Sequence, residues 1–407
     1  MSPSVDIDLL APEAVQDPHP LHDRLRSEDP VHWYARFQSW YLTCFEDIVA
    51  VLRDHHRFSS RRARWLMTCQ LSAEARAEIE PLLAGMELAF VFLDPPKHRV
   101  IRRHVADAFT PRHVETLRAR VTRVVHDLLE DVAGRGRMDV VSDLACVVPA
   151  RVIAELFGVP QEDSRFFQRW TRAMNRLMGL SADPPRDVLH AIGSELTAMG
   201  IYFIGLIQRR RREPSDDLLG RIVESQRNDA EFTDAELLAT CVMIIFGGDE
   251  MVQNTIANAV MLLLTHPEQM KRLGARPELV PSALEECLRY EPPAATWGRI
   301  ATEDVEIRGR RIRAGDHVVV SYASANRDPG VFQDPHRFDI ERAPNPHISF
   351  SAGIHHCIGA SLARMNGQIV LSALLTRMPR LGLATDVIPW GAESLGIRSL
   401  RALPVTF

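Results

Sequence analysis

Apolar residues recur every three or four positions through most of residues 100–285, which is the spacing of one buried face of an α-helix. The segments RHVETLRARVTRVVHDLLEDVAG (112–134) and DVLHAIGSELTAMGIYFIGLIQRRRR (187–212) show this spacing clearly. A further helix is expected in ASLARMNGQIVLSALLTRM, over residues 360–378. The pattern therefore predicts a mostly helical protein.

Strand-like segments occupy much less of the chain. The aromatic, roughly alternating segment PVHWYARFQSWYLTCF (30–45) predicts a hairpin, and EDIVAVLRDH (46–55) after it has helical spacing. DVEIRGRRIRAGDHVVVSYASAN (304–326) predicts strands joined by Arg-Gly and Ala-Gly turns, and SLRALPVTF (399–407) predicts a last strand. No linker rich in Pro, Gly or Ser separates two cores, so we expect one large domain over residues 1–407, mostly α with a small β region.

One predicted helix has an unusual interior. Thr233 and Glu236 stand at the spacing of a capping box, and Pro267 ends the pattern, so the helix should run for roughly 32 residues, or about 48 Å at 1.5 Å per residue. Its middle reads GGDE (247–250), although glycine costs about 1 kcal/mol in a helix interior and buried acids add a desolvation cost. A bend on a solvated face would explain this. The apolar segments CVMIIF before it and IANAVMLLL after it favour a buried, functional site.

Composition narrows the class of protein. Hydrophobic residues make up 46% and charged residues 25% of the chain, which is typical of a soluble globular protein. A formal net charge of −5 gives no basic field for nucleic acid. We find neither a signal peptide nor an apolar run long enough to cross a membrane. The six cysteines stand singly, with no CxxC, which indicates a reducing, cytoplasmic compartment.

The segment FSAGIHHCIG (350–359) carries the strongest chemical signal. Its Cys357 could bind zinc together with His347, His355 and His356, but adjacent histidines rarely converge on one tetrahedral ion. An iron–sulfur cluster would need further cysteines nearby. A single thiolate ligand to haem iron needs none. The glycines would let the backbone approach a flat macrocycle, and the helix that follows would offer N–H groups to the thiolate.

These ten residues resemble the cysteine loop of the cytochrome P-450 (haem-thiolate monooxygenase) family, in its soluble bacterial class, whose pattern is F-x-x-G-x-[HR]-x-C-x-G. The resemblance implies the fold of that family, a haem b cofactor and Cys357 as the axial ligand to its iron. It also implies that His98 and Arg102 of DPPKHRVIR, with Arg299 and His355, bind the haem propionates.

Two further motifs of the family are present in order. In ECLR, Glu286 and Arg289 lie three residues apart on one helix face, and the resemblance implies that they pair with an arginine of a later loop, here Arg337 in DPHRF. The long helix matches the family pattern [AG]-G-x-[DE]-T except at its last position, where Met251 replaces the hydroxyl residue. Thr255 is one turn further on, about 6 Å away, and is too far to be a simple substitute.

The resemblance implies O2 activation at haem iron, followed by hydroxylation or oxidative coupling of a bound small molecule in natural-product biosynthesis. Glu250 is then the candidate proton relay, with Asp249 beside it, and Met251 completes the catalytic set. Electrons would come from a ferredoxin and a ferredoxin reductase. These would dock near basic residues such as Arg99, Arg103 and Arg112.

The resemblance implies that substrate contacts lie in residues 60–92, 170–200, 243–255, 292–298 and 393–398, and these segments are largely apolar. They favour a hydrophobic or aromatic small molecule. Their aromatic side chains are Trp65, Phe90, Phe92 and Trp297. We expect neither nucleic acid nor a membrane as partner. Two alternatives stay open: a haem-binding sensor or carrier without turnover, which would need Cys357 but not the acids, and a zinc-dependent enzyme.

Overall fold

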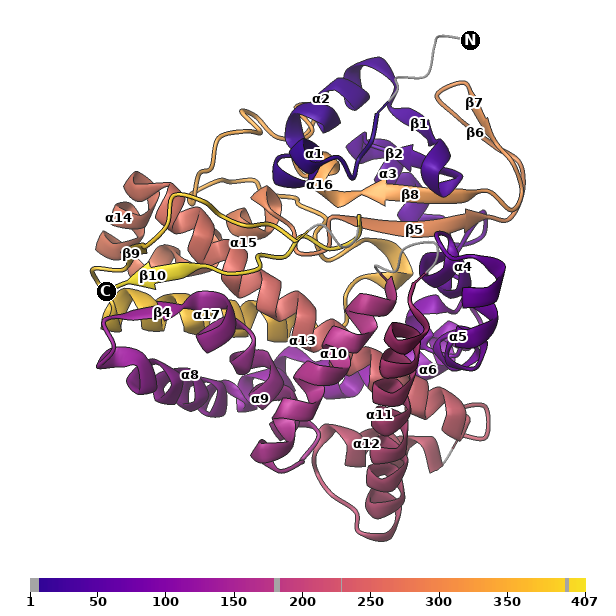
Figure 1. The fold of residues 1–407 in the computed structure, drawn as a ribbon, viewed down its shortest axis with the longest axis horizontal. Helices are drawn as coiled ribbons and strands as arrows, with labels where there is room; N and C mark the ends of the chain where they lie inside the picture. Colours follow the sequence, from indigo (N-terminus) through magenta and orange to yellow (C-terminus); the bar gives the residue numbers. More distant parts are fainter. Residues whose placement is uncertain (1–6, 179–183, 228, 392–394) are drawn as a thin grey trace. The chain divides into compact units, whose positions relative to one another are not determined.

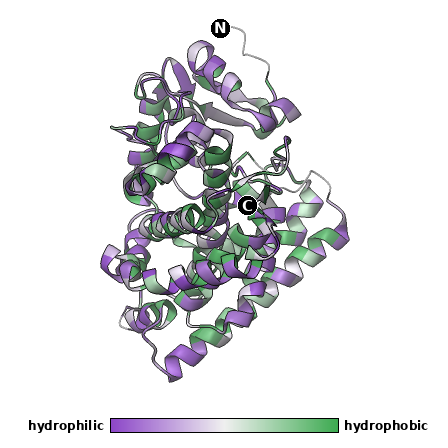
Figure 2. Cartoon of the chain, turned by 90° about the vertical axis from the view of Figure 1, so that its left-hand side faces the viewer, coloured by the Kyte–Doolittle hydropathy of each residue, from purple (hydrophilic) through white to green (hydrophobic). Residues whose placement is uncertain are grey.

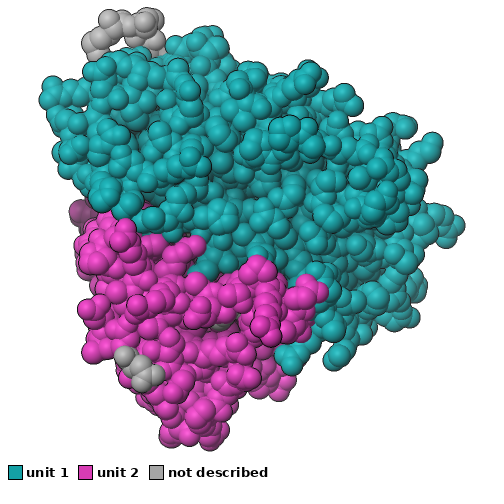
Figure 3. Space-filling view, turned by 180° about the vertical axis from the view of Figure 1, so that it is seen from behind, with its two compact units in different colours: residues 1–58, 118–148, 251–407 teal, residues 59–117, 149–250 magenta. Residues whose placement is uncertain are grey.

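The computed structural model describes residues 7–178, 184–227, 229–391 and 395–407. Their backbone contacts define two compact units, which Figure 3 shows in two colours. Unit 1 comprises residues 1–58, 118–148 and 251–407, and unit 2 comprises residues 59–117 and 149–250. The expectation of a single domain over the whole chain stays a prediction.

The largest sheet has the strand order β1-β2-β8-β5-β3. Its strands are β1 (Val31–Tyr34), β2 (Ser39–Leu42), β3 (Phe58–Ser59), β5 (Thr296–Ala301) and β8 (His317–Ser321). β1 and β2 form the predicted antiparallel hairpin, β8 runs parallel to β2, and β5 runs antiparallel to β8. The β-rich run near residue 317 therefore joins a hairpin that lies almost 300 residues earlier.

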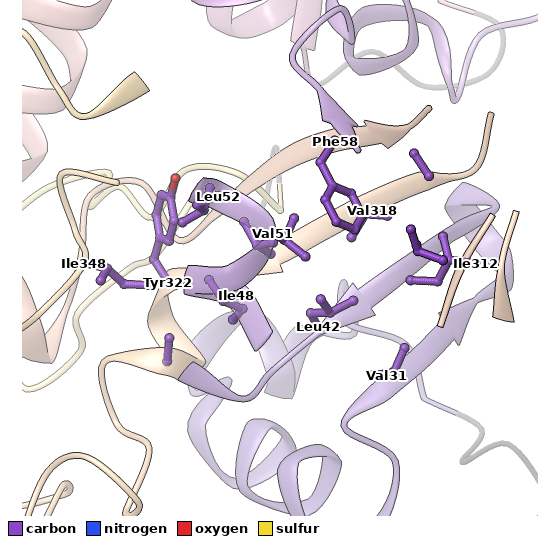
Figure 4. Packing of buried hydrophobic residues seen from close by; sticks show 14 residues of the cluster. Val31, Leu42, Ile48, Val51, Leu52, Phe58, Ile312, Val318, Tyr322 and Ile348 are labelled. Carbon is purple, nitrogen blue, oxygen red and sulfur yellow. The ribbon is translucent and has the colours of Figure 1, made fainter. Parts of the chain in front are cut away.

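A hydrophobic cluster covers this sheet (Figure 4). Helix α3 (Phe45–Arg53) contributes Ile48, Val51 and Leu52, which the helical spacing places on one face, and Leu42 and Val318 face them from the strands. All five side chains are almost fully buried. This packing fixes the end of α3, and the cysteine loop rests against that end.

Unit 1 also contains further helices and small sheets (Figure 1). The remaining helices of unit 1 are α1 (Pro12–Gln16), α2 (His19–Glu28), α8 (Arg118–Ala133), α14 (Pro267–Ala275), α15 (Val280–Tyr290), α16 (Tyr322–Ala325) and α17 (Ala360–Arg377). Its short strands are β4 (Arg137–Asp139), β9 (Gly382–Leu383) and β10 (Pro404–Thr406), which form one sheet, and β6 (Val305–Ile307) and β7 (Arg310–Ile312), which form a hairpin. The strands and helices expected over residues 304–326, 360–378 and 399–407 are thus confirmed.

Unit 2 is helical among its described residues. Its helices are α4 (Ala63–Thr68), α5 (Ala73–Met86), α6 (Lys97–Ala106), α7 (Pro111–Thr116), α10 (Ser164–Met178), α11 (Arg186–Arg212) and α12 (Leu218–Arg227), together with most of α9 (Val147–Leu156). Helices α10 and α11 lie side by side (Figure 1), and rings of both helices pack edge to face. The single helix expected over residues 112–134 is divided into α7 and α8.

The long middle helix, α13, runs from Asp234 to Thr265 and has 32 residues, as predicted. The capping box is formed: Glu236 accepts from the Thr233 N–H at 2.9 Å, and the Glu236 N–H donates to the Thr233 hydroxyl at 3.3 Å. Lys97 adds an ion pair to Glu236 at 2.9 Å. The division between the two units falls within this helix, after Glu250.

The helices carry both hydrophobic and hydrophilic residues along their length (Figure 2). One helix among the described residues, α11, is by length and composition apolar enough to cross a membrane, and 33% of its most apolar window is buried. The sequence analysis did not anticipate this. A single helix of this kind also occurs in the cores of soluble proteins, so it is weak support for a membrane span.

Candidate functional site

The cysteine loop is a tight turn in unit 1 that presents an exposed thiol. The Cys357 N–H donates to the Phe350 carbonyl at 2.8 Å, which closes the loop, and the His356 N–H donates to the Gly353 carbonyl at 3.1 Å. Cys357 is exposed, and α17 begins three residues later. The chain thus places the thiol just before the N-terminus of a helix, where N–H groups and the helix dipole stabilise a thiolate.

The absence of a side chain has a different physical consequence at each of the two glycines of the loop. Gly353 has a φ of 72°, and a Cβ there would lie 2.6 Å from the carbonyl oxygen of Leu52 at the end of α3. Gly353 therefore lets the loop approach α3 closely. At Gly359 a Cβ would meet no described protein atom within 4 Å. That position is open, as the approach of a flat group beside Cys357 requires.

The segment before the loop is fixed by side-chain hydrogen bonds that the sequence analysis missed. Asn326 accepts from the Ile348 N–H at 2.9 Å and donates to the Ser349 hydroxyl at 2.8 Å. The Ser349 hydroxyl donates to the carbonyl of Leu288 on α15 at 2.7 Å. These bonds connect the loop to two elements that are distant in sequence.

Glu286 and Arg289 of α15 form the predicted pair, and both side chains are fully buried. Arg289 donates to both carboxylate oxygens of Glu286 at 2.7 Å. The third partner was predicted wrongly. It is Arg342, whose Nε lies 3.1 Å from Glu286 Oε2, and not Arg337.

The backbone conformation of the later loop explains this correction. Arg337 directs its carbonyl inward, where it accepts from Arg289 at 3.1 Å and from Arg342 at 2.9 Å. Its side chain points to solvent, is 61% exposed and pairs only loosely with Asp339 at 3.6 Å. Arg337 therefore contributes to the cluster through its main chain.

The neighbouring acid, Glu285, forms a second ionic contact that the sequence analysis did not identify. It accepts from Arg364 of α17 at 2.7 Å and from His347 at 3.0 Å, and the Arg364 guanidinium lies 4.4 Å from the centre of the Phe350 ring. Burial alone raises the pKa of the Glu285 carboxyl, but the hydrogen bonds from Arg364 and His347 outweigh it and lower the pKa to about 2. The sequence signal was the adjacent pair of acids in EEC.

The four residues expected to bind the cofactor propionates are divided between the units. Arg299 is 2% exposed on β5, and His355 lies in the short 3-10 turn η7 (Gly353–His355), both in unit 1. His98 is 1% exposed and stands four residues before Arg102 on α6, in unit 2. Proline residues precede α6, as predicted. Because His98 and Arg102 are four residues apart on this helix, they share one face. Their convergence with Arg299 and His355 on one group is part of the proposal below.

The acid pair of α13 is buried within unit 2. Asp249 is 1% exposed and Glu250 is 6% exposed. A Cβ on Gly248 would lie 3.1 Å from the Ile153 side chain of α9, so glycine allows this close contact. Asn175 of α10 donates to the Glu250 carboxylate. Burial raises the pKa of the Asp249 carboxyl to about 7; the Thr171 hydroxyl lowers it and the Glu250 charge raises it.

The residue at the departing position of the motif, Met251, is half-buried. The Thr255 hydroxyl donates to the Met251 carbonyl at 2.8 Å, one turn back along the same helix. This hydroxyl is therefore used by the backbone, which agrees with the expectation that Thr255 does not replace the missing residue.

The zinc alternative finds no support among the residues that the structure describes. Within that part of the chain, no group of three or more His, Cys, Asp or Glu side chains could hold a metal ion. His347, one of the candidate zinc ligands, instead pairs with Glu285.

Comparisons with known proteins cover nearly all of the chain. Residues 73–378 match the family model described as Cytochrome P450. The chain is 36% identical to the "Biotin biosynthesis cytochrome P450" of Bacillus subtilis (strain 168), over 97% of each protein. It is 39% identical to "Nocardicin C N-oxygenase" of Nocardia uniformis subsp. tsuyamanensis, over 96% of each protein.

Solved structures agree with this result. The crystal structure of P450BioI in complex with hexadec-9Z-enoic acid ligated acyl carrier protein matches with a TM-score of 0.88 and 35% identity, over 98% of this chain and 100% of that one. The crystal structure of CalO2 matches with a TM-score of 0.89 and 35% identity, over 98% of each chain. The fold predicted from the cysteine loop and its companion motifs is thus confirmed.

Proposed function

Because the chain belongs to the cytochrome P450 family and is a haem-thiolate monooxygenase, we propose that it oxidises a hydrophobic or aromatic small molecule in natural-product biosynthesis, by hydroxylation or oxidative coupling. The observation that carries this proposal is the exposed thiol of Cys357, held at the end of a closed loop and before a helix N-terminus. A cytoplasmic location fits the singly placed cysteines.

Haem b fits the residues present. Cys357 would supply the thiolate ligand to the iron, Gly359 leaves open space beside it, and four cationic or imidazole side chains would bind the propionates. These four are His98, Arg102, Arg299 and His355. When bound, the haem supplies the O2 chemistry. The side chains of the protein would transfer protons and limit the entry of water.

The acid pair would hold and transfer protons. Glu250 would act at its carboxylate oxygens and Asp249 would store a proton, since an acid with a pKa of about 7 is partly protonated at neutral pH. Met251 donates no proton and fills space beside the acids, so it would limit the entry of water. Either the substrate or a water that it orders would then supply the hydroxyl that the family motif usually provides.

The substrate class and the electron donor follow from the same proposal. Trp65 is half-buried and Phe90 and Phe92 are buried in unit 2, and Trp297 is half-buried in unit 1, so the segments that would contact the substrate carry aromatic side chains. Electrons would come from a ferredoxin and its reductase. Arg99, Arg103 and Arg112 are exposed in unit 2 and could contact an acidic ferredoxin.

A second candidate is oxidation of a substrate that is bound to an acyl carrier protein. Helix α10 carries four exposed arginines at spacings of four, three and four residues, and no acidic residue. They are Arg165, Arg169, Arg172 and Arg176. Such a stripe is complementary to an acidic carrier protein, and one solved relative was crystallised with its acyl carrier protein.

The haem assignment is tested through Cys357. The reduced carbon monoxide complex of the purified protein should show the Soret position of a thiolate ligand, and Cys357→Ala should lose this position together with all turnover. Retention of the thiolate-type spectrum in the variant would show that another residue is the ligand. Turnover with a surrogate ferredoxin system distinguishes the enzyme from a haem sensor or carrier, which would give the spectrum alone.

The substrate class is tested by spectral titration of the haem. A library of apolar and aromatic small molecules is compared with a hexadecenoyl acyl carrier protein and with the free acid. A carrier-bound substrate should bind more tightly than the free acid, and this advantage should decline with salt and in Arg165→Glu/Arg176→Glu. Equal binding of the carrier-bound and free forms would exclude the second candidate.

A further inference from the structure

Asp249 is an acid that the family motif does not require, since Glu250 already fills the acidic position. We propose that Asn175 of α10 is a positioning residue that makes this pair hold one proton, with Glu250 kept as the carboxylate and Asp249 as the protonated partner. The proposal rests on the proposed function for its role in oxidation. The arrangement of the three side chains itself stands on observations within unit 2.

Asn175 identifies which acid stays ionised. Its side-chain N–H group donates to Glu250 Oε2, and a donor of this kind stabilises a carboxylate rather than a protonated acid. The carbonyl oxygen of Asn175 is buried and has no hydrogen-bond partner among the described residues. An amide has no charge. It therefore favours the ionised form of Glu250 without neutralising the pair.

The surroundings of Asp249 favour its protonated form, whereas those of Glu250 favour the carboxylate. It is almost completely buried, and its Oδ1 finds no hydrogen-bond partner among the described residues, so the charged form lacks the donors that would stabilise it. The charged groups that act on it are Glu250, which raises its pKa, and Arg172 of α10, which lowers it. Two adjacent acids that cannot both be ionised at low cost hold one proton between them.

Helix α10 places an uncharged side chain against the pair, because Asn175 donates to Glu250. A Lys or Arg in place of Asn175 would balance the negative charge, and both acids could then be ionised. The uncharged amide leaves the proton in place, and the arginine stripe stands on the exposed face of the same helix.

The experiment is an infrared titration of the haem-loaded protein between pH 5 and 9, following the C=O band of protonated carboxylic acids. Ordinary surface acids are ionised above about pH 5.5, so few groups contribute to the band. We expect a band with a midpoint near pH 7 that Asp249→Asn removes. Because the readout is protonation and not turnover, it holds even if the proposed substrate class is wrong.

Variants of α10 test the positioning role of Asn175. Asn175→Leu should transfer the proton to Glu250, so that the band becomes sensitive to Glu250→Gln and no longer to Asp249→Asn. Arg165→Gln, on the exposed face of α10, is the matched control and should leave the titration unchanged.

Two results would overturn the proposal. Asp249→Asn could leave the band unaltered, which would place the proton elsewhere. Asn175→Leu could titrate like the wild type, with a band that still depends on Asp249, which would make α10 irrelevant to the pair. If Asn175→Leu does not load haem, the smaller Asn175→Ala replaces it, and a wild-type titration in that variant rejects the role of α10.

Discussion

At the scale of single residues, the two arginines near Glu286 give the sharpest test. Arg342→Ala leaves the buried Glu286 carboxylate with one partner fewer and should lower the free energy of unfolding by about 3 kcal/mol. Arg337→Ala, its matched control, removes an exposed side chain and should cost less than about 1 kcal/mol, since the carbonyl that accepts from Arg289 remains. Denaturant unfolding measures both. A larger loss for Arg337→Ala would restore the original assignment.

The residue scale also shows where sequence reasoning stops. The ECLR motif predicted that Glu286 pairs with Arg289, because three residues on a helix give one geometry. Its third partner lies in an irregular loop. The backbone conformation of that loop, and not the sequence spacing, decides which arginine side chain reaches Glu286. That side chain belongs to Arg342 and not to Arg337. Asn175 was missed for a related reason: its partner Glu250 is 75 residues away, and a single asparagine in an amphipathic helix gives no signal of its own.

At the scale of elements, the close approach of α17 to α15 can be tested through two glycines. A Cβ on Gly367 would lie 2.8 Å from the Leu284 side chain of α15, so Gly367→Ala must separate the helices or displace that leucine. We expect a loss of about 1–3 kcal/mol, as for other overpacked cores. Gly274→Ala in α14 meets nothing within 4 Å and should be neutral or stabilising by up to about 1 kcal/mol. A lower melting temperature for Gly367→Ala alone is the expected result.

Elements were predicted best where local chemistry defines their ends. The capping box of Thr233 and Glu236 and the proline at 267 gave the bounds of α13 correctly. The expected helix over residues 112–134 was too long, because helical spacing continues across the break at Leu117. Pairing between distant elements, such as β2 with β8, could not be derived from local pattern, since each strand only shows that it is buried.

At the scale of the whole molecule, acid stability should depend on Glu285. Its pKa is about 2 in the folded protein and about 4.5 without partners, so its contribution is complete above about pH 4.5 and is lost as the pH falls towards 2. Melting temperatures of wild type and Glu285→Gln should therefore differ clearly at pH 6, and the difference should be smaller at pH 3 and vanish only below about pH 2. Glu303→Gln, at an exposed loop position, is the control and should not change the profile. A constant difference between Glu285→Gln and wild type at all pH values would contradict the linkage.

The predicted fold class and family were confirmed over nearly the full chain, because the cysteine loop and the motifs of α13 and α15 are specific in order and spacing. The substrate is a different matter. It depends on the shape of the surface that the substrate contacts, and composition shows only that the candidate segments are hydrophobic. Single-domain organisation also stays a prediction, since the described chain forms two compact units.

The exposure of Cys357 has a consequence for chemical labelling. Burial raises the pKa values of Cys241 and Cys287, and of Cys69 to about 11, so these thiols should alkylate slowly, whereas Cys357 is exposed before a helix N-terminus. Haem-free protein should therefore take up iodoacetamide first at Cys357, and haem-loaded protein should be protected there. Peptide mass spectrometry after brief alkylation would then report the fraction of haem-free molecules in any preparation, independently of colour. Equal modification of Cys357 with and without haem would show that the cofactor does not cover this thiol.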